Sequence, residues 1–269
     1  MLIDTHCHLE ESQFVGGVQP VIQRARASGV AGFVDVGVGS NDRSLAAVAL
    51  AKRVRAVAAA VGIDPHEAAS ADDGRWQVVE ELAHNSVVVA IGETGLDYFY
   101  RDSPESVQRQ VFARQVALAR RVCKPLIIHT REALTDTVEL LKREGASTVG
   151  GVFHCFSGGV DFARAVLDLG FFISFSGLLT FASDEALSEA ARFAPADRIV
   201  VETDSPYLSP VPVRKCRPCE PSFVVHTARY LAELRRTDFE ELCEQTTRNA
   251  QRLFAFQFEP DGVHPPAIG

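Results

Sequence analysis

The sequence lacks any apolar segment long enough to cross a membrane. Its longest candidate, "LAAVALAKRVRAVAAAVGI", is interrupted by Lys52, Arg53 and Arg55, whereas a transmembrane helix needs about 20 consecutive apolar residues. The opening "MLIDTHCHLE" places an aspartate and two histidines where a secretory signal would have its apolar core. We therefore expect a cytoplasmic protein that does not enter membranes, and nothing in the sequence calls for an obligate protein partner.

An excess of positive charge is also missing. The formal net charge is -8, so a nucleic-acid partner would be contacted through a local basic loop or bound cations rather than through overall charge. Of the six cysteines, only Cys216 and Cys219 form a CxxC pair, and no second CxxC would complete a zinc site. We interpret this pair as incidental packing and expect reduced thiols.

Short apolar runs alternate with helix-like segments along the whole chain. Eight of these runs are almost continuously hydrophobic, as is typical of buried parallel strands; they are residues 1–5, 31–37, 55–63, 86–93, 124–130, 150–156, 170–176 and 198–204. Eight strand–helix units predict a (β/α)8 TIM barrel, with a doubly wound parallel sheet as the alternative. We expect residues 1–258 to form one barrel domain and residues 259–269, rich in proline and glycine, to form a loose tail.

Residues of the kinds that bind metals gather at the ends of five of these runs. Asp4, His6 and His8 are spaced two apart on the first strand, which predicts that they share one face. The carboxyl ends of barrel strands meet at one mouth, where enzymes of this fold have their active sites. Imidazole and carboxylate together suit Zn²⁺, Mn²⁺ or a similar ion. The sequence therefore predicts a metal centre at this mouth, to which the other runs contribute Glu93, His129, His154 and Asp204.

The motifs that carry these residues resemble those of the TatD family of metal-dependent deoxyribonucleases. In order, they are "DTHCHL", "GETGLDYF", "PLIIHTREA", "GVFHCFSG" and "ETDSPYL", spread over residues 1–210. The resemblance implies an amidohydrolase-like barrel and an Mg²⁺- or Mn²⁺-dependent 3′–5′ nuclease acting on DNA. It also implies that Glu93 bridges two divalent ions, and that the complete ligand set is His6, His8, Glu93, His129, His154 and Asp204.

The chain departs from the family pattern at two places near the expected substrate. "DPH" stands where family members usually carry "HPH", so Asp64 replaces a histidine and His66 remains. The loop that usually reads like "RGKRNEP" is "RKCRPCEP", which puts Cys219 roughly in the place of an asparagine. We predict substrate contacts from His66, Arg131 and Ser157, and from a basic loop that contains Arg214, Lys215 and Arg217.

The predicted chemistry rests on two carboxylates. Two ions about 3.5–4 Å apart can supply a nucleophile, neutralise phosphate oxygens and stabilise the leaving group. We predict that Asp204 is the general base as well as a ligand, because it follows the last strand beside the first-strand histidines, and that Glu93 is the other catalytic carboxylate. Glu202 and Asp97 are candidates to hydrogen-bond to the ligands, although Asp97 is equally a candidate turn residue. The segment "YFYR", residues 98–101, would either stack an unpaired base, which suits single-stranded ends, or pack as a loop.

Three other interpretations stay open. An amidohydrolase acting on cyclic amides would share the barrel, but many such enzymes bridge their metals with a modified lysine, and none of the four lysines here follows a predicted strand. A D-aminoacyl-tRNA deacylase would use the same site. A non-enzymatic metal-binding or scaffold protein would not need His129, His154 and Asp204 at one mouth.

Overall fold

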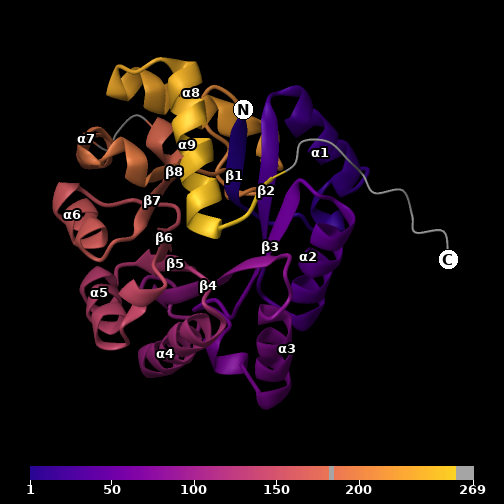
Figure 1. Ribbon diagram of the computed structural model, residues 1–269, viewed down its shortest axis with the longest axis vertical. Helices are drawn as coiled ribbons and strands as arrows, with labels where there is room; N and C mark the ends of the chain where they lie inside the picture. The colour runs from indigo at the N-terminus through magenta and orange to yellow at the C-terminus, as the bar shows by residue number, and fades with distance from the viewer. Residues whose placement is uncertain (182–184, 259–269) are drawn as a thin grey trace.

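The computed structural model of the protein describes residues 1–181 and 185–258. Its centre is a sheet of eight parallel strands that neighbour each other in chain order (Figure 1). The predicted tail, residues 259–269, lies outside the described residues. The strands are β1 Leu2–Cys7, β2 Val30–Gly37, β3 Val57–Val61, β4 Val88–Asp97, β5 Leu126–Arg131, β6 Gly151–Phe153, β7 Phe172–Phe175 and β8 Ile199–Val201.

The first and last strands meet and nearly close the sheet into a barrel. Cys7 forms a parallel bridge with Ser205, just beyond β8. The backbone N–H of Asp204 donates to the carbonyl of His6 at 2.9 Å, and that of His8 donates to the carbonyl of Ser205 at 2.8 Å. This closure confirms the predicted TIM barrel and excludes an open doubly wound sheet, in which the first and last strands would be free edges.

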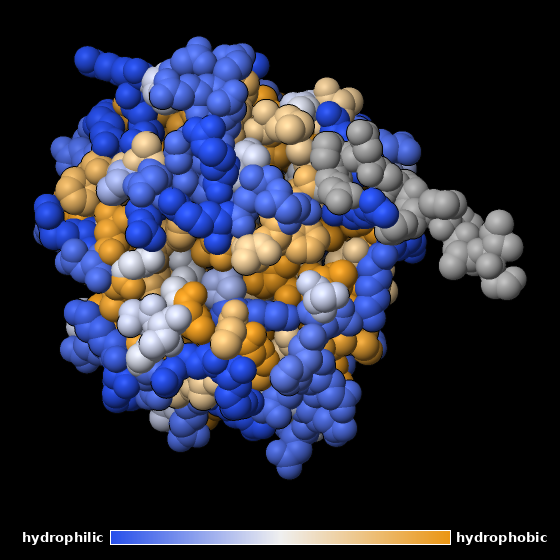
Figure 2. Space-filling model, in the orientation of Figure 1, coloured by the Kyte–Doolittle hydropathy of each residue, from blue (hydrophilic) through white to orange (hydrophobic). Residues whose placement is uncertain are grey.

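The helices form an outer layer around the strands (Figure 1). Hydrophilic residues cover much of their outer surface on the face drawn in Figure 2, with hydrophobic residues in the furrows between them. None of the described helices combines the length and the hydrophobicity that a membrane span requires. The helices are α1 Val18–Ala27, α2 Asn41–Arg53, α3 Asp73–Ala83, α4 Glu105–Val122, α5 Leu134–Arg143, α6 Val160–Asp168, α7 Glu185–Phe193, α8 Val224–Arg235 and α9 Phe239–Phe254.

Alternation along the strands divides the buried apolar side chains into two clusters. Phe33 and Val57 belong to the larger cluster, which contains most of the buried helix residues. Val34 and Ala58, one position further along the same strands, belong to a second cluster made mainly of strand residues. Because successive strand side chains point to opposite faces, the second cluster is the filling of the barrel and the first is the layer between barrel and helices.

The last helix covers the end of the barrel at which the strands begin. Phe254 in α9 and Phe258 pack in the same cluster as Ile3 and Val34. A Cβ added to Gly32, near the start of β2, would lie 2.5 Å from Cδ1 of Phe258, so only glycine lets this ring approach the strand. The end of the barrel where the strands finish, at which the metal centre is predicted, is the opposite one and is called the catalytic end.

Candidate metal centre

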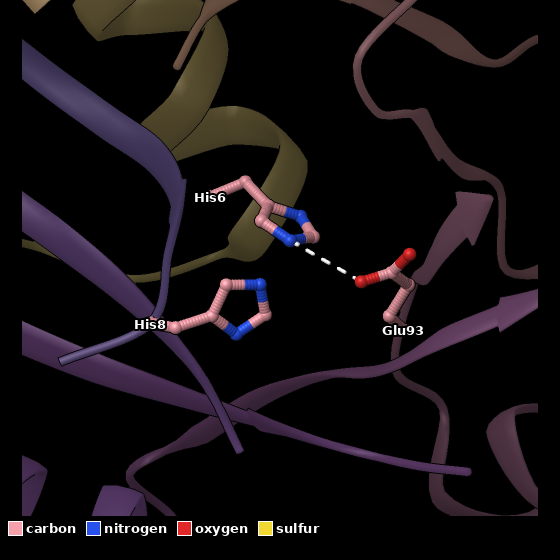
Figure 3. Close-up of side chains that lie close together, drawn as sticks. All are labelled: His6, His8 and Glu93. Atoms are coloured by element: carbon pink, nitrogen blue, oxygen red, sulfur yellow. Dashed lines mark ion pairs between the residues drawn. The ribbon is translucent and has the colours of Figure 1, made fainter. Parts of the chain in front are cut away.

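Glu93 lies at the centre of the predicted ligands. One carboxylate oxygen, Oε2, lies 3.4 Å from Nε2 of His6, and the other, Oε1, lies 2.8 Å from Nδ1 of His129 and 3.0 Å from Nε2 of His154. Figure 3 shows His6 and His8 on one side and Glu93 reaching toward His6 from the other. Its two oxygens therefore face histidines from different parts of the barrel, β1 on one side and β5 and β6 on the other.

Asp204 lies on the β1 side of this cluster. Its Oδ1 atom is 3.6 Å from Nε2 of His8 and 3.8 Å from Nε2 of His6. The backbone of Asp204 is left-handed, with φ 57°, a conformation that costs energy for a residue other than glycine, although aspartate adopts it more readily than most. The hydrogen bond from Asp204 N–H to His6 at the barrel closure holds this carboxylate beside the first-strand histidines.

Two of the histidines are oriented by hydrogen bonds at their outer nitrogens, and a third by a longer ion-pair contact. Nδ1 of His8 lies 2.8 Å from the carbonyl of Val36, Nε2 of His129 lies 2.9 Å from Oδ2 of Asp97, and Nδ1 of His154 lies 3.4 Å from Oε1 of Glu202. Such acceptors favour a proton on the outer nitrogen and leave a lone pair on the inner one. The inner nitrogens are the atoms that face Glu93 or Asp204, so they are available as metal ligands.

His6 provides an independent test of whether a cation fits. Its side chain is fully buried, yet neither ring nitrogen has a hydrogen-bond partner. Buried polar nitrogens are normally satisfied, and a cation between His6 and the carboxylates would satisfy this one. Two compact groups of potential ligands share Glu93, namely His6–His8–Glu93 and Glu93–His129–His154. This set of nitrogen and oxygen donors fits a divalent cation.

The pKa shifts within the cluster also support a cation site. Burial opposes ionisation of Glu93, but the charge of His154 and the close contacts with His129, His154 and His6 hold the pKa of Glu93 well below its usual range. Burial opposes the charge of His129 as well, but the contacts with Asp97 and Glu93 raise its pKa to about 9. Without metal, His129 and His154 carry protons that balance the carboxylates. A divalent cation would take over that role.

Asp97 and Glu202 have the contacts expected of residues that orient ligands. Asp97 combines both predicted roles, because its other oxygen, Oδ1, accepts the backbone N–H groups of Phe99 and Tyr100 and so forms a turn. Glu202 accepts the backbone N–H of Cys155 at 2.6 Å and the hydroxyl of Ser174 at 2.5 Å. Both carboxylates are buried and are therefore fixed by their hydrogen bonds.

The three residues predicted to contact substrate lie in different environments. His66 is part of the site, because its Nε2 lies 3.6 Å from Oδ2 of Asp97 and its Nδ1 lies 2.9 Å from Asp102. Arg131 is exposed at the end of β5, with its guanidinium 3.9 Å from the ring centre of Phe99. Ser157 is exposed in the loop between β6 and α6.

The predicted basic loop follows β8 and is held at two points. The guanidinium of Arg214 lies 3.3 Å from the ring centre of Phe181, and that of Arg217 donates to the hydroxyl of Ser209. Lys215 is exposed between them. The loop therefore presents a basic side chain to solvent at the catalytic end of the barrel.

The two departures from the family pattern have structural roles. The Asp64 carboxylate accepts the backbone N–H groups of His66 at 2.9 Å and Glu67 at 3.1 Å, so it shapes the turn that presents His66. Cys219 is buried and burial raises its pKa to about 12, whereas Cys216 is exposed; both are free thiols. A thiol with so high a pKa is a poor nucleophile, which agrees with packing rather than redox chemistry.

Two sequence expectations about strands need correction. The fourth strand does not end at Glu93 but continues to Asp97; its register against β5 shifts between Ile91 and Thr94, so the carboxylate projects from within an irregular strand. Asp4 does not join the histidines, because its carboxylate accepts the backbone N–H and the hydroxyl of Thr203. The register of β1 is irregular between Asp4 and Cys7, so strict alternation does not hold there.

Sequence reasoning missed two buried glutamines on α4 that support the site. Gln108 donates to the carbonyl of Asp97 and accepts its N–H. Gln115 bridges the carbonyl of Ile63 and the hydroxyl of Thr94. The available signal was their spacing of seven residues, which places two amides on one helix face. Gly95 is also required, because a Cβ there would collide with the carbonyl of His129.

A TIM barrel with buried imidazoles and carboxylates at the catalytic end has the architecture of a metal-dependent hydrolase. The family model described as TatD related DNase matches residues 3–255, and the chain belongs to this family. The uncharacterized metal-dependent hydrolase YabD of Bacillus subtilis is 41% identical over 254 residues, which cover 94% of this chain and 99% of the relative.

Two further relatives link the family to nucleic acids and to this fold. The 3′-5′ ssDNA/RNA exonuclease TatD of Edwardsiella piscicida is 34% identical over 261 residues, 94% of this chain and 99% of the relative. The crystal structure of YJJV, a TatD homolog from Escherichia coli K12, has a TM-score of 0.89 and 28% identity, and the match covers 95% of this chain and 98% of that one. The protein is thus a metal-dependent hydrolase of the TatD family.

Proposed function

We propose that the protein is a 3′–5′ deoxyribonuclease that hydrolyses phosphodiester bonds at single-stranded DNA ends with two divalent ions, Mg²⁺ or Mn²⁺, with Zn²⁺ as a possible substitute. The observation that carries this proposal is the position of Glu93, whose two oxygens face His6 on one side and His129 and His154 on the other. A carboxylate in this position suits a bridge between two ions. The name of the Edwardsiella piscicida relative supports nucleic acid as the substrate.

The cytoplasm is the proposed location. All six cysteines are free. Free thiols of this number persist in a reducing compartment. DNA ends are available there to an enzyme of this kind.

Each residue of the site has a proposed part in hydrolysis. Bound ions would supply Lewis acidity toward the phosphate and an acidified water. Asp204 accepts the proton of the attacking water, since its carboxylate lies 3.6 Å from Nε2 of His8 and its side chain is partly exposed. Glu93 would provide a carboxylate oxygen to each of the two groups of potential ligands. His66 and Arg131 bind the phosphate backbone, with Ser157 as a further contact.

One observation weighs against the cyclic-amide hydrolase. The position between the two ligand groups is held by Glu93 and not by a lysine. The D-aminoacyl-tRNA deacylase shares every ligand with the nuclease, so only a substrate comparison separates the two. Both alternatives therefore belong in the test.

The experiment is an assay of purified protein on a 5′-labelled single-stranded DNA, a D-aminoacyl-tRNA and a cyclic amide. We expect the DNA to shorten stepwise from its 3′ end, EDTA to abolish the reaction, and Mg²⁺ or Mn²⁺ to restore it. A circular single strand, which has no end, is the matched control and should stay intact. Full activity in protein that elemental analysis shows to be metal-free would refute the proposal, as would hydrolysis of the tRNA ester or the amide alone.

A further inference from the structure

Exposed aromatic side chains are concentrated at the catalytic end of the barrel. Phe99, Tyr100 and Tyr207 are 50%, 57% and 55% exposed, and among the described residues Phe193 is the one other exposed phenylalanine or tyrosine. Large aromatic surfaces are costly to leave in water, so three of them around one site need an explanation. Tyr98, their neighbour, does not belong to this set, because its hydroxyl donates to Asp136 at 2.7 Å.

Phe99 and Tyr100, which we call the β4 aromatic surface, are tied directly to the candidate metal centre. Oδ1 of Asp97 accepts both of their backbone N–H groups, at 3.0 and 2.9 Å. Oδ2 of the same carboxylate lies 2.9 Å from His129. The guanidinium of Arg131 lies 3.9 Å from the ring centre of Phe99 and 4.8 Å from that of Tyr100. This cation–π contact fixes the rings and places a positive charge beside them.

Tyr207, which we call the β8 aromatic surface, is tied to the centre in a similar way. Its backbone N–H donates to the carbonyl of Asp204 at 2.9 Å, and its ring centre lies 6.3 Å from that of His8. The strands follow one another around the barrel in the order β1 to β8. β4 and β8 are four strands apart in a ring of eight and therefore lie on opposite sides of the mouth, with the ligand cluster between them.

We infer that these two aromatic surfaces stack the unpaired bases of the last two nucleotides, one on each side of the phosphate that is cleaved. This inference rests on the proposed nuclease function and identifies the residues that select single strands. Stacking on Phe and Tyr rings is available to every base but requires that the base be unpaired. Arg131 and His66, next to the β4 aromatic surface, are suited to the adjoining phosphate.

The test uses single-stranded DNA in which a tetrahydrofuran abasic residue replaces either the 3′-terminal or the penultimate nucleotide. Stacking of one base on an aromatic side chain changes affinity by about 5- to 150-fold. For the unmodified enzyme we expect kcat/KM to fall by this factor at each position. The double variant Phe99→Ala/Tyr100→Ala should become insensitive to the abasic residue at one position, and Tyr207→Ala at the other. Tyr207→Phe, which keeps the ring, should behave like the unmodified enzyme.

Phe193→Ala is the matched control, because Phe193 is exposed on α7 and its ring contacts Arg164 instead of the site. It should retain both abasic penalties. Variants that slow intact and abasic DNA equally would overturn the inference, since the rings would then only position loops. Indifference of the unmodified enzyme to abasic residues would overturn it as well. If the unmodified enzyme with Mn²⁺ cleaves no DNA at all, the proposed function itself fails.

Discussion

The two ends of this barrel differ in the chemistry of their buried side chains. At the end where the strands begin, Phe254 and Phe258 pack onto Ile3 and Val34, and the contact is apolar. At the end where the strands finish, many buried side chains are imidazoles and carboxylates. Neighbouring groups shift the pKa of several of them, such as Glu93 and His129. One chain thus places its stabilising contacts and its reactive groups at opposite ends of the same strands.

The fold can accommodate a site of buried charged groups because those groups are paired at one end and apolar contacts stabilise the other. A buried charge costs several kcal/mol unless it is paired, and at the mouth Asp97 pairs with His129 and Glu202 pairs with His154. The apolar end contributes free energy of folding and has no part in chemistry. Mutations at the catalytic end should therefore change mainly activity, and mutations at the apolar end should change mainly stability.

The largest expected effect is that of Asp204→Asn. The change keeps the size of the side chain and one oxygen ligand but removes the proton acceptor. We expect kcat to fall by roughly 10²–10⁴-fold, the range for loss of a general base. The melting temperature and the affinity for substrate should change far less, because Glu93 and the histidines remain. The measurements are kcat on single-stranded DNA and thermal unfolding of the same preparation.

His6→Ala is the control that separates a base from a ligand. Removing this buried imidazole should lower metal occupancy, so excess Mn²⁺ should restore part of the activity. The quantity to compare is kcat as a function of added Mn²⁺ for both variants. If added metal rescues Asp204→Asn as fully as His6→Ala, then Asp204 is only a ligand and the base lies elsewhere.

Phe254→Ala should give the opposite result at the apolar end. Phe254 is buried in the barrel-filling cluster, and truncation of a buried phenylalanine costs about 3–5 kcal/mol. In a protein of this size each kcal/mol lowers the melting temperature by about 2–4 °C. We expect kcat of the folded, metal-loaded variant to stay within about twofold of the original. Phe256→Ala, at a partly buried position beside the same cluster, should cost less stability. A large loss of kcat at full folding would show that the two ends are coupled.

Most of the fold could be predicted from the sequence because strand signals were strong. Continuous runs such as residues 55–63 and 170–176 contain β3 and β7, and buried parallel strands require such runs. The end of β4 could not be predicted. Glycines at positions 92 and 95 interrupt the apolar run, and the strand continues to Asp97 because it pairs with β5 there.

The ligand cluster could also be predicted, because each ligand type follows an apolar run and the fold brings the runs to one mouth. The orientation of each imidazole could not. It depends on contacts between distant segments, such as His8 with Val36 and His154 with Glu202. The roles of the buried amides of Gln108 and Gln115 could not be predicted for the same reason, since the glutamines lie on α4 and their partners Asp97 and Thr94 lie on β4.

The smallest expected effect concerns Asp35, a buried carboxylate of β2 that lies near the mouth but outside the ligand cluster. It accepts the backbone N–H of Leu9 at 2.9 Å. Burial raises its pKa from 3.8 to about 6, against the smaller opposing effects of the Leu9 hydrogen bond and the charge of His8. Asp35 is thus a carboxyl group at the catalytic end whose contacts stabilise the charged form too little to offset the cost of burial.

The direction of the pH dependence follows from the difference in the pKa of Asp35 between the folded and the unfolded protein. The folded protein holds the Asp35 proton more tightly than the unfolded chain, so stability from this group is complete below about pH 4 and is lost as the pH rises to about 6. Asp35→Asn keeps an oxygen that can accept from Leu9 but never ionises. In EDTA we expect the variant to be more stable than the original by about 1–3 kcal/mol above pH 6, with the difference disappearing near pH 4. Asp197→Asn, at an exposed position, should show no such pH-dependent difference. Urea unfolding across this pH range measures both, and a constant difference between Asp35→Asn and the original would mean that the Asp35 carboxylate ionises as readily in the folded protein as in the unfolded chain.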